Sequence, residues 1–227
     1  LWMHPDELVR SGPEVVSWFH EVYRRRVEYV DGELDLLLQR VEAAGQGRAL
    51  VTVLTSDHGE GFDAERGRLH HGARLHDDLL RVPLLLRAPG RVEAGRVVSE
   101  QVRLLDVLPT LLDLAGLPVP EGLSGRTLLP LLSEGSESPA RLAWSEDHLG
   151  SRRISLRAAG WKAMDLPEGE ELYALDADPL EDRPLPGPLP EPLRGPWQDR
   201  YRLLEPRTGV DRQHDPATLE QLRRLGY

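Results

Sequence analysis

The chain has 227 residues, of which 40% are hydrophobic, and its 28 basic and 38 acidic residues give a formal net charge of −10. This size allows one sizeable core with a small appendage, and the acidic balance argues against a nucleic-acid or anionic-membrane partner. The sequence contains no cysteine, which excludes a disulfide framework, a thiolate metal cluster and a thiol nucleophile.

A long amphipathic helix is predicted for the first part of the chain. Ser11 is expected to cap this helix, with Pro13 in its first turn. Apolar residues then recur in steps of three and four, at Phe19, Tyr23, Val27, Val30, Leu34, Leu37 and Val41. The periodicity continues through Asp31 and Gly32, so we expect one helix that ends at Gly45.

The apolar run over residues 50–54 is short and rich in β-branched residues. Such a run is typical of a buried central strand in a parallel sheet. Polar residues, including Asp57 and His58, begin where the run stops, and in open α/β sheets this end of a strand collects ligands and catalytic groups. Gly59 and Gly61 are expected to allow a sharp turn and a close backbone approach.

The next segment is predicted to cross the strand ends and return to the sheet. Residues 62–71 are polar and contain glycine, which indicates a loop, and residues 73–80 predict a short helix. A second buried strand is expected over residues 81–87, with Pro83 near its start and a Pro89-Gly90 turn after it.

A second helix is predicted after a short strand over residues 97–102. Asp106 is expected to cap this helix, and Gly116 is expected to end it. Strands that alternate with helices indicate an α/β fold with a mostly parallel sheet flanked by helices.

The pattern changes near residue 141. Four short strand-like pieces predict a small antiparallel sheet, over residues 141–144, 154–158, 161–164 and 171–175. Residues 178–196 are dense in proline and are expected to be irregular, whereas Asp215-Pro216 predicts the start of a final helix. We therefore predict an α/β portion over residues 1–140 and a small antiparallel subdomain over residues 141–227.

Five segments resemble, in order, the carboxyl-terminal half of sulfatases in the alkaline-phosphatase superfamily. They are TSDHGEGF, HHGARLHDDLLRVPLLLRAPG, VRLLDVLPTLLDLAGLPVP, GRTLLPLL, and GWKAMDL followed by ELYALDADPLEDRPL. The resemblance covers roughly residues 23–186 and implies an alkaline-phosphatase-like α/β fold whose amino-terminal part lies outside this chain.

The resemblance also implies an activity and its cofactors. Sulfatases hydrolyse sulfate esters of small molecules or glycans with a formylglycine and a divalent metal, for which calcium is expected and manganese or zinc is compatible with an imidazole ligand. The formylglycine and the early acidic ligands are expected outside this chain, which we interpret as a carboxyl-terminal fragment that is inactive alone. The family favours a periplasmic or extracellular location.

Three residues are assigned roles through the resemblance. Asp57 and His58 match the late metal-binding pair of the family, and they offer a hard oxygen and a nitrogen ligand. The alternative is that Ser56 or Asp57 caps a following helix and His58 is a surface residue. His71 matches the residue that assists the leaving oxygen of the ester, with His70 as its rival because the loop length leaves the register open.

Other polar residues near this segment allow more than one interpretation. Glu60 is expected either to support the His58 ring by a hydrogen bond or to cap a helix start. A solvated helix face is predicted for His76, Asp77 and Asp78.

No lysine lies between Asp57 and Pro89, where many sulfatases place one on the sulfate group. Histidine or arginine would have to replace it, and Arg81 and Lys162 are candidate anion contacts. This departure leaves two alternatives open, a phosphodiester or phosphonate hydrolase of the same superfamily and a non-catalytic remnant of the fold.

Overall fold

The computed structural model describes residues 12–45, 50–63, 65, 68–71, 74–133, 140–147 and 153–200. The chain divides into two compact units, Leu1–Leu193 and Arg194–Tyr227. The predicted boundary near residue 140 stays a prediction. Within the described ranges, no helix is both long and apolar enough to cross a bilayer.

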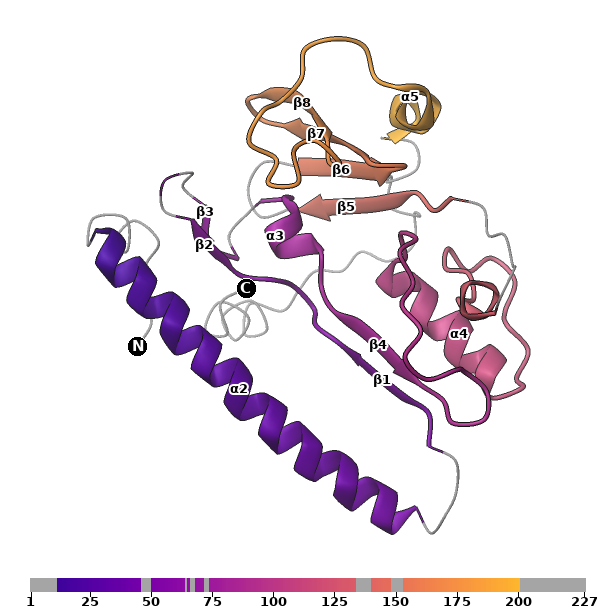
Figure 1. Ribbon diagram of the computed structural model, residues 1–227. Coiled ribbons are helices and arrows are strands. Elements are labelled where there is room, and N and C mark those ends of the chain that lie inside the picture. The colour runs from indigo at the N-terminus through magenta and orange to yellow at the C-terminus, as the bar shows by residue number, and fades with distance from the viewer. Residues whose placement is uncertain are drawn as a thin grey trace, which may run out of the picture. The chain divides into compact units, whose positions relative to one another are not determined.

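The first described element is a single long helix, α2 (Pro13–Ala44), as predicted (Figure 1). Its N-cap is Gly12, with φ 84°, and not Ser11, which lies outside the described residues. Val16 and Phe19 near the helix start pack against the buried Leu69. Much of the remaining apolar stripe of α2 is exposed, including Val27, Val30, Leu37 and Val41.

The two strands expected in a mostly parallel sheet instead pair antiparallel with each other. β1 (Thr52–Thr55) and β4 (Leu84–Arg87) align Thr52 with Arg87 and Thr55 with Leu84. A parallel pair needs a crossover connection that carries the chain back along the strand, usually a full helix. The connection here holds a hairpin and a four-residue helix, so the chain simply reverses. All strand pairs among the described residues are antiparallel.

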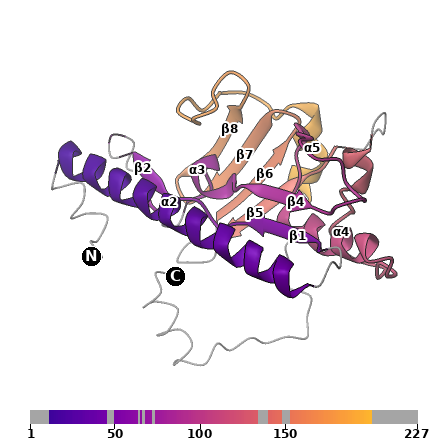
Figure 2. The ribbon, with the colours of Figure 1, turned by 60° about the horizontal axis from the view of Figure 1, so that its bottom comes forward.

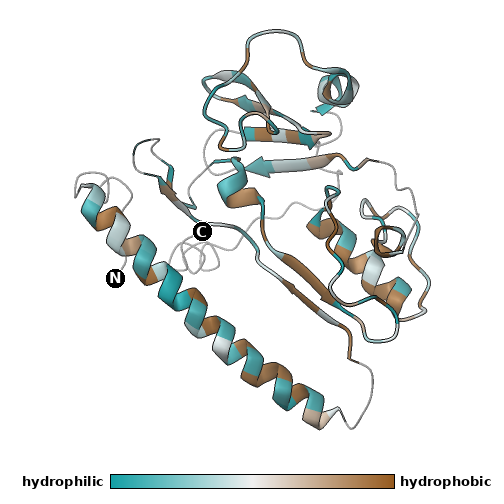
Figure 3. Ribbon diagram, in the orientation of Figure 1, coloured by the Kyte–Doolittle hydropathy of each residue, from teal (hydrophilic) through white to brown (hydrophobic). Residues whose placement is uncertain are grey.

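β1 and β4 are also less buried than their apolar sequences predict. Leu85 is 56% exposed and Leu54 is 39% exposed. Figure 3 colours most of the ribbon of β1 and β4 as hydrophobic, and in Figures 1 and 2 helix α2 runs alongside these two strands. Each strand keeps one edge without a strand partner in the described part of the chain.

A short hairpin replaces the loop predicted over residues 62–71. β2 (Gly61–Asp63) pairs with β3 (Arg68–His70), and Phe62 lies opposite Leu69. The Phe62 ring lies 5.0 Å, between centroids, from the Tyr23 ring of α2. The hairpin therefore forms where two apolar side chains, spaced to meet across it, can pack on α2.

The segment after β4 contains a helix but not the strand predicted over residues 97–102. A 3-10 turn, η1 (Leu104–Asp106), leads into α4 (Val107–Leu114), and Gly116 with φ 69° follows its end. Asp106 occupies the predicted cap position, but its buried carboxylate binds Arg103 and Arg141 and accepts the Arg126 backbone N–H. A second 3-10 turn, η2, spans Leu129–Leu132.

The predicted antiparallel sheet is confirmed (Figure 2). Its four strands lie in chain order, β5 (Ala143–Asp147), β6 (Arg153–Ala158), β7 (Trp161–Leu166) and β8 (Gly169–Ala174). Met164, Tyr173 and Leu175 form a core cluster with Leu75, which precedes the short helix α3 (Asp77–Leu80). This cluster places α3 against the sheet.

Helix α5 (Glu191–Gln198) begins within the segment 178–196 that is predicted to be irregular and extends two residues beyond it. Proline is compatible with the first turn of a helix because its missing N–H would have no intrahelical partner there, and Pro192 occupies that turn. The final helix predicted from Asp215 lies outside the described residues.

A buried ion cluster, composed of Lys162, Asp77 and Glu181, connects α3 to the sheet. The Lys162 ammonium on β7 lies 2.8 Å from Asp77 Oδ1 and 2.7 Å from Glu181 Oε1. The Glu181 carboxylate also accepts the Asp77 backbone N–H at 2.6 Å. Asp77 is therefore not on a solvated face, and the Lys162 side chain, 1% exposed, is not available to a substrate anion.

Candidate active site

Asp57 and His58 lie just beyond the end of β1, and their side chains converge. Asp57 Oδ2 is 3.8 Å from His58 Nε2, while Asp57 Oδ1 accepts the His58 backbone N–H at 3.0 Å. His58 Nδ1 lies 2.7 Å from the Gly59 carbonyl. A carbonyl oxygen only accepts, so Nδ1 carries the proton and Nε2 presents its lone pair on the Asp57 side. Asp57 itself is 65% exposed.

This arrangement fits a divalent cation. Metal-binding imidazoles commonly donate their other N–H to a backbone carbonyl, as His58 does, which fixes the tautomer and the ring orientation. A separation of 3.8 Å between the carboxylate oxygen and the imidazole nitrogen suits two ligands of one cation with metal–ligand distances of about 2.0–2.5 Å. No helix starts at residues 57–60, so the alternative in which Ser56 or Asp57 caps a helix is wrong.

Gly59 connects the Asp57–His58 pair to α3. Its backbone N–H donates to the Leu79 carbonyl at 2.8 Å, and a Cβ at position 59 would lie 2.0 Å from the Asp78 carbonyl oxygen. Gly61 is equally confined, because a Cβ there would lie 2.6 Å from the Arg68 carbonyl oxygen. These glycines are therefore required by close backbone contacts with α3 and β3.

His71 follows β3 and stacks on His58. The two ring centroids are 4.4 Å apart with the planes tilted by 33°. His71 Nδ1 lies 3.2 Å from Glu60 Oε2. Glu60 precedes β2 and not a helix, so it does not cap a helix start, and its carboxylate reaches the histidines of the β3 end.

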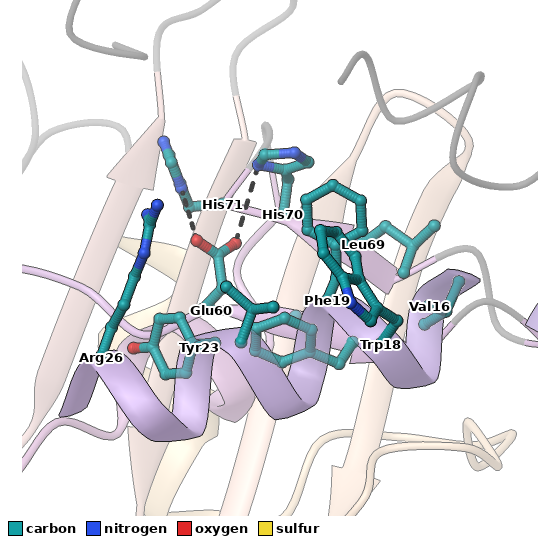
Figure 4. Close-up of a pocket in the computed structure, with 12 residues that line it drawn as sticks. Val16, Trp18, Phe19, Tyr23, Arg26, Glu60, Leu69, His70 and His71 are labelled. Carbon is teal, nitrogen blue, oxygen red and sulfur yellow. Dashed lines mark hydrogen bonds and ion pairs between the residues drawn. The ribbon is translucent and has the colours of Figure 1, made fainter. Parts of the chain in front are cut away.

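His70 lies on the other side of the same carboxylate, with its Nδ1 3.9 Å from Glu60 Oε1 (Figure 4). It has φ 60°, a left-handed backbone conformation that is uncommon for residues with a side chain. Arg74 stabilises this conformation by donating a hydrogen bond to the His70 carbonyl at 2.9 Å, while its other guanidinium nitrogen binds Asp78 of α3.

A pocket of about 260 Å³ lies between this cluster and α2. Figure 4 shows Glu60, His70 and His71 above it, with Trp18, Phe19, Tyr23 and Arg26 of α2 forming the opposite wall. The site thus combines an apolar wall with a carboxylate, imidazoles and one guanidinium. Pockets of this composition, with few convergent polar groups, are typical of small-ligand sites.

The structure brings most of the predicted site residues together. Asp57, His58 and His71 form one group, and His70 adjoins them through Glu60. Lys162 is held in the buried ion cluster, and Arg81 is exposed next to α3.

Sequence reasoning missed the contribution of α2 to this pocket. Arg26 follows Phe19, Val22 and Tyr23 at helical spacing on a pocket-lining face. The signal was a single cation within a mostly apolar helical stripe.

Comparison with known proteins agrees with this architecture. Residues 13–117 match the family model for sulfatase, and residues 68–186 match the model for the carboxyl-terminal part of N-sulphoglucosamine sulphohydrolase. Arylsulfatase K of Danio rerio is 35% identical over 185 residues, which cover 77% of this chain and 34% of the relative. An N-acetylglucosamine-6-O-sulfatase of Bacteroides thetaiotaomicron is 30% identical over 188 residues, covering 75% of this chain and 33% of the relative.

A solved structure described as a complex with its substrate D-glucosamine-2-N,6-O-disulfate superposes with a TM-score of 0.61. It is 22% identical and covers 88% of this chain and 38% of that chain, so it supports the fold alone. The fold is that of part of an alkaline-phosphatase-like domain. The chain belongs to the sulfatase family. It spans about a third of the length of the curated relatives it matches.

Proposed function

We propose that this chain forms the carboxyl-terminal part of a sulfatase that hydrolyses sulfate esters, with a divalent metal at Asp57 and His58 and with His71 at the leaving group. The observation that carries the proposal is the convergence of these three side chains beyond β1, with His58 Nε2 directed to the Asp57 carboxylate and the His71 ring stacked on His58.

The metal bound there, calcium in this proposal, would supply positive charge that neutralises and orients the oxygens of the transferring group. His71 donates a hydrogen bond or a proton to the ester oxygen that leaves. Glu60 accepts from His71 Nδ1, which directs the opposite ring nitrogen away from the carboxylate. Arg26 provides the positive charge that contacts the sulfate group, since no lysine lies nearby. The apolar wall of α2 limits the access of water.

The names of the relatives support a substrate class. The reported relatives are sulfatases by name, and one is named an N-acetylglucosamine-6-O-sulfatase. We therefore propose a sulfated sugar or glycan in preference to a phosphodiester or phosphonate. The aromatic side chains of Trp18 and Tyr23 on the pocket wall are suited to contact a sugar ring.

The formylglycine nucleophile, in this proposal, comes from an amino-terminal sulfatase portion that packs on α2 and on the β1–β4 ribbon. Supporting it are the coverage of about a third of each relative and the exposed apolar residues of both elements. The open strand edges can also accept further strands of a larger sheet. A dye that binds exposed apolar surface should therefore bind the 227-residue chain more strongly than a protein containing both portions.

Two measurements test the metal assignment. In the full-length protein, Asp57→Asn should lower kcat/KM for an aryl sulfate or a sulfated glucosamine by at least about 100-fold, and chelation should have a similar effect on the unsubstituted enzyme. In the 227-residue chain, the same substitution should weaken calcium binding. Calorimetry measures this binding directly and does not require an active enzyme. Asp35→Asn on the exposed face of α2 is the matched control.

His71→Asn should lower kcat by about 10²–10⁴-fold for a substrate with a poor leaving group and by less for one with a good leaving group, because only the former needs a proton donor. Unchanged calcium binding and turnover in Asp57→Asn would contradict the metal site, and equal losses for both leaving groups in His71→Asn would contradict the assigned role of His71.

A further inference from the structure

Three potential metal ligands converge at the open end of the β2–β3 hairpin, separately from the Asp57–His58 pair. Glu60, His70 and His71 each offer one ligand atom, and these atoms all lie within 4.8 Å of one another. We infer that these three residues form a second cation site, selective for zinc or another imidazole-preferring transition metal, and that a metal there inhibits the hydrolase.

The distances are close to those that coordination requires. Both imidazoles turn Nδ1 towards the carboxylate, at 3.2 Å for His71 and 3.9 Å for His70 (Figure 4). Ligands of a tetrahedral zinc ion, each about 2.0–2.2 Å from the metal, lie about 3.3–3.5 Å apart. The His71–Glu60 distance of 3.2 Å lies just below this range and the His70–Glu60 distance of 3.9 Å lies just above it, so side-chain rotations of a few tenths of an ångström would bring both to coordination distance.

The Glu60 carboxylate carries an unused ligand atom. Its Oε1 is buried and has no hydrogen-bond partner among the described residues, although Oε2 is near His71 Nδ1. A buried carboxylate oxygen without a donor is costly, so it indicates a partner beyond these side chains. A cation between Glu60 and His70 provides that partner.

The backbone of His70 has an unusual left-handed conformation, which also points to a functional site. A left-handed conformation at a residue with a Cβ costs roughly 1–3 kcal/mol, and such conformations concentrate at functional sites. At φ 60°, His70 turns its imidazole to the same carboxylate as His71, although adjacent residues in a regular strand point to opposite faces. The strain thus places two consecutive imidazoles on one ligand set.

The donor types distinguish this site from the first. Two nitrogen ligands and one carboxylate favour zinc, copper or nickel, whereas the first site offers only one nitrogen from this chain, that of His58, beside the Asp57 carboxylate. Three protein ligands leave a coordination position for water or an incoming group, and the adjoining pocket provides room for it.

Inhibition is the part of the inference that rests on the proposed function. His71 Nδ1 would bind the metal in place of its proton, which immobilises the ring and removes its hydrogen bond to Glu60. The ring would then no longer be free to assist the leaving group. Binding itself does not depend on hydrolysis and is measurable on the 227-residue chain.

The test is zinc binding to the 227-residue chain by calorimetry, together with the visible spectrum of bound cobalt as a reporter of tetrahedral nitrogen and oxygen coordination. Glu60→Gln keeps the side-chain shape, and His70→Asn keeps a residue that tolerates the left-handed backbone. Each should weaken zinc binding at least about 10-fold and abolish the cobalt spectrum. His20→Asn, on α2 outside the ligand set, is the matched control and should bind normally.

Asp57→Asn separates the two sites, because it removes a ligand of the first site only and should keep the zinc-binding step and the cobalt spectrum that Glu60→Gln and His70→Asn lose. Zinc binding that is lost in Asp57→Asn and kept in Glu60→Gln would overturn the inference, as would the absence of zinc binding. Unchanged circular dichroism establishes that each variant is folded. If zinc binds through Glu60 and His70 but the full-length protein lacks sulfatase activity, the proposed function fails while the metal site stands.

Discussion

The buried ion cluster provides the sharpest stability prediction, for Lys162→Met. Methionine fills a similar volume but removes the charge that faces both Asp77 and Glu181. Asp77 would keep Arg157, whose Nε lies 3.3 Å from Asp77 Oδ2. Glu181, with a side chain 1% exposed, would lose its cation, and removal of one partner from a buried pair typically costs about 3–5 kcal/mol.

The pH dependence of the loss has a definite sign. Burial is the largest influence on Glu181 and raises its pKa above the ordinary value, while Lys162 opposes that rise. Without Lys162, the pKa of Glu181 rises further, so the folded variant binds a proton more readily than its unfolded chain. The deficit of the variant should therefore be larger at pH 7.5 than at pH 5.

Urea unfolding at both pH values measures the free energy of unfolding. It is applied to the unsubstituted chain, to Lys162→Met and to the double variant Lys162→Met/Glu181→Gln. The double variant should recover part of the loss, because the orphaned charge is gone. A loss below about 1 kcal/mol, as for an exposed ion pair, would refute the reasoning. So would a deficit that grows as the pH falls.

Three further predictions use the same unfolding assay. Gly59→Ala should destabilise the chain by about 1–3 kcal/mol, because its Cβ would lie 2.0 Å from the Asp78 carbonyl oxygen. Gly32 lies in a helix with open space around it, so Gly32→Ala should instead stabilise the chain by about 0.5–1 kcal/mol. Burial alone would raise the pKa of Asp106, but hydrogen bonds from its arginine partners and their charge lower it, so Asp106→Asn should cost about 3–5 kcal/mol at pH 7 and less as the pH falls below 4. Burial and then nearby cations lower the pKa of His76 from 6.5 to about 4, so stability should decline from pH 6.5 towards pH 4 as only the unfolded chain protonates, and His76→Gln should reduce that slope.

Two kinds of element could be predicted from the sequence alone. The continuous helix α2 and the four-stranded sheet β5–β8 follow from patterns within each segment: a 3.6-residue period, and short strands separated by turns. Gly160, with φ 77°, lies in the turn between β6 and β7. Both predictions depend only on residue patterns within each segment.

The direction of β1 and β4 could not be derived in that way. Their apolar runs indicate strands, but composition carries no information on whether two strands run parallel, because that depends on the connection. The sequence predicts a loop and a helix between them, whereas Phe62 packs on α2 and the loop residues form a hairpin. A contact between distant segments therefore decided the topology.

The role of Glu60 shows how the same hairpin determines the candidate site. The sequence leaves two alternatives for Glu60, support of His58 two residues earlier or the cap of a helix start. The antiparallel register pairs Gly61 with His70, so the next pair outward brings Glu60 opposite His71, and the 3.2 Å contact between them follows. A shift of one residue would have sent these side chains to opposite faces. Gly61 helps to fix this register, because a larger residue would collide with the Arg68 carbonyl oxygen of the partner strand. The Gly-Glu-Gly sequence therefore favours the histidine–carboxylate cluster through strand pairing. Gly61→Ala, as a test of this register, should weaken the zinc binding proposed at Glu60 while the strand pairs of β5–β8 stay in place.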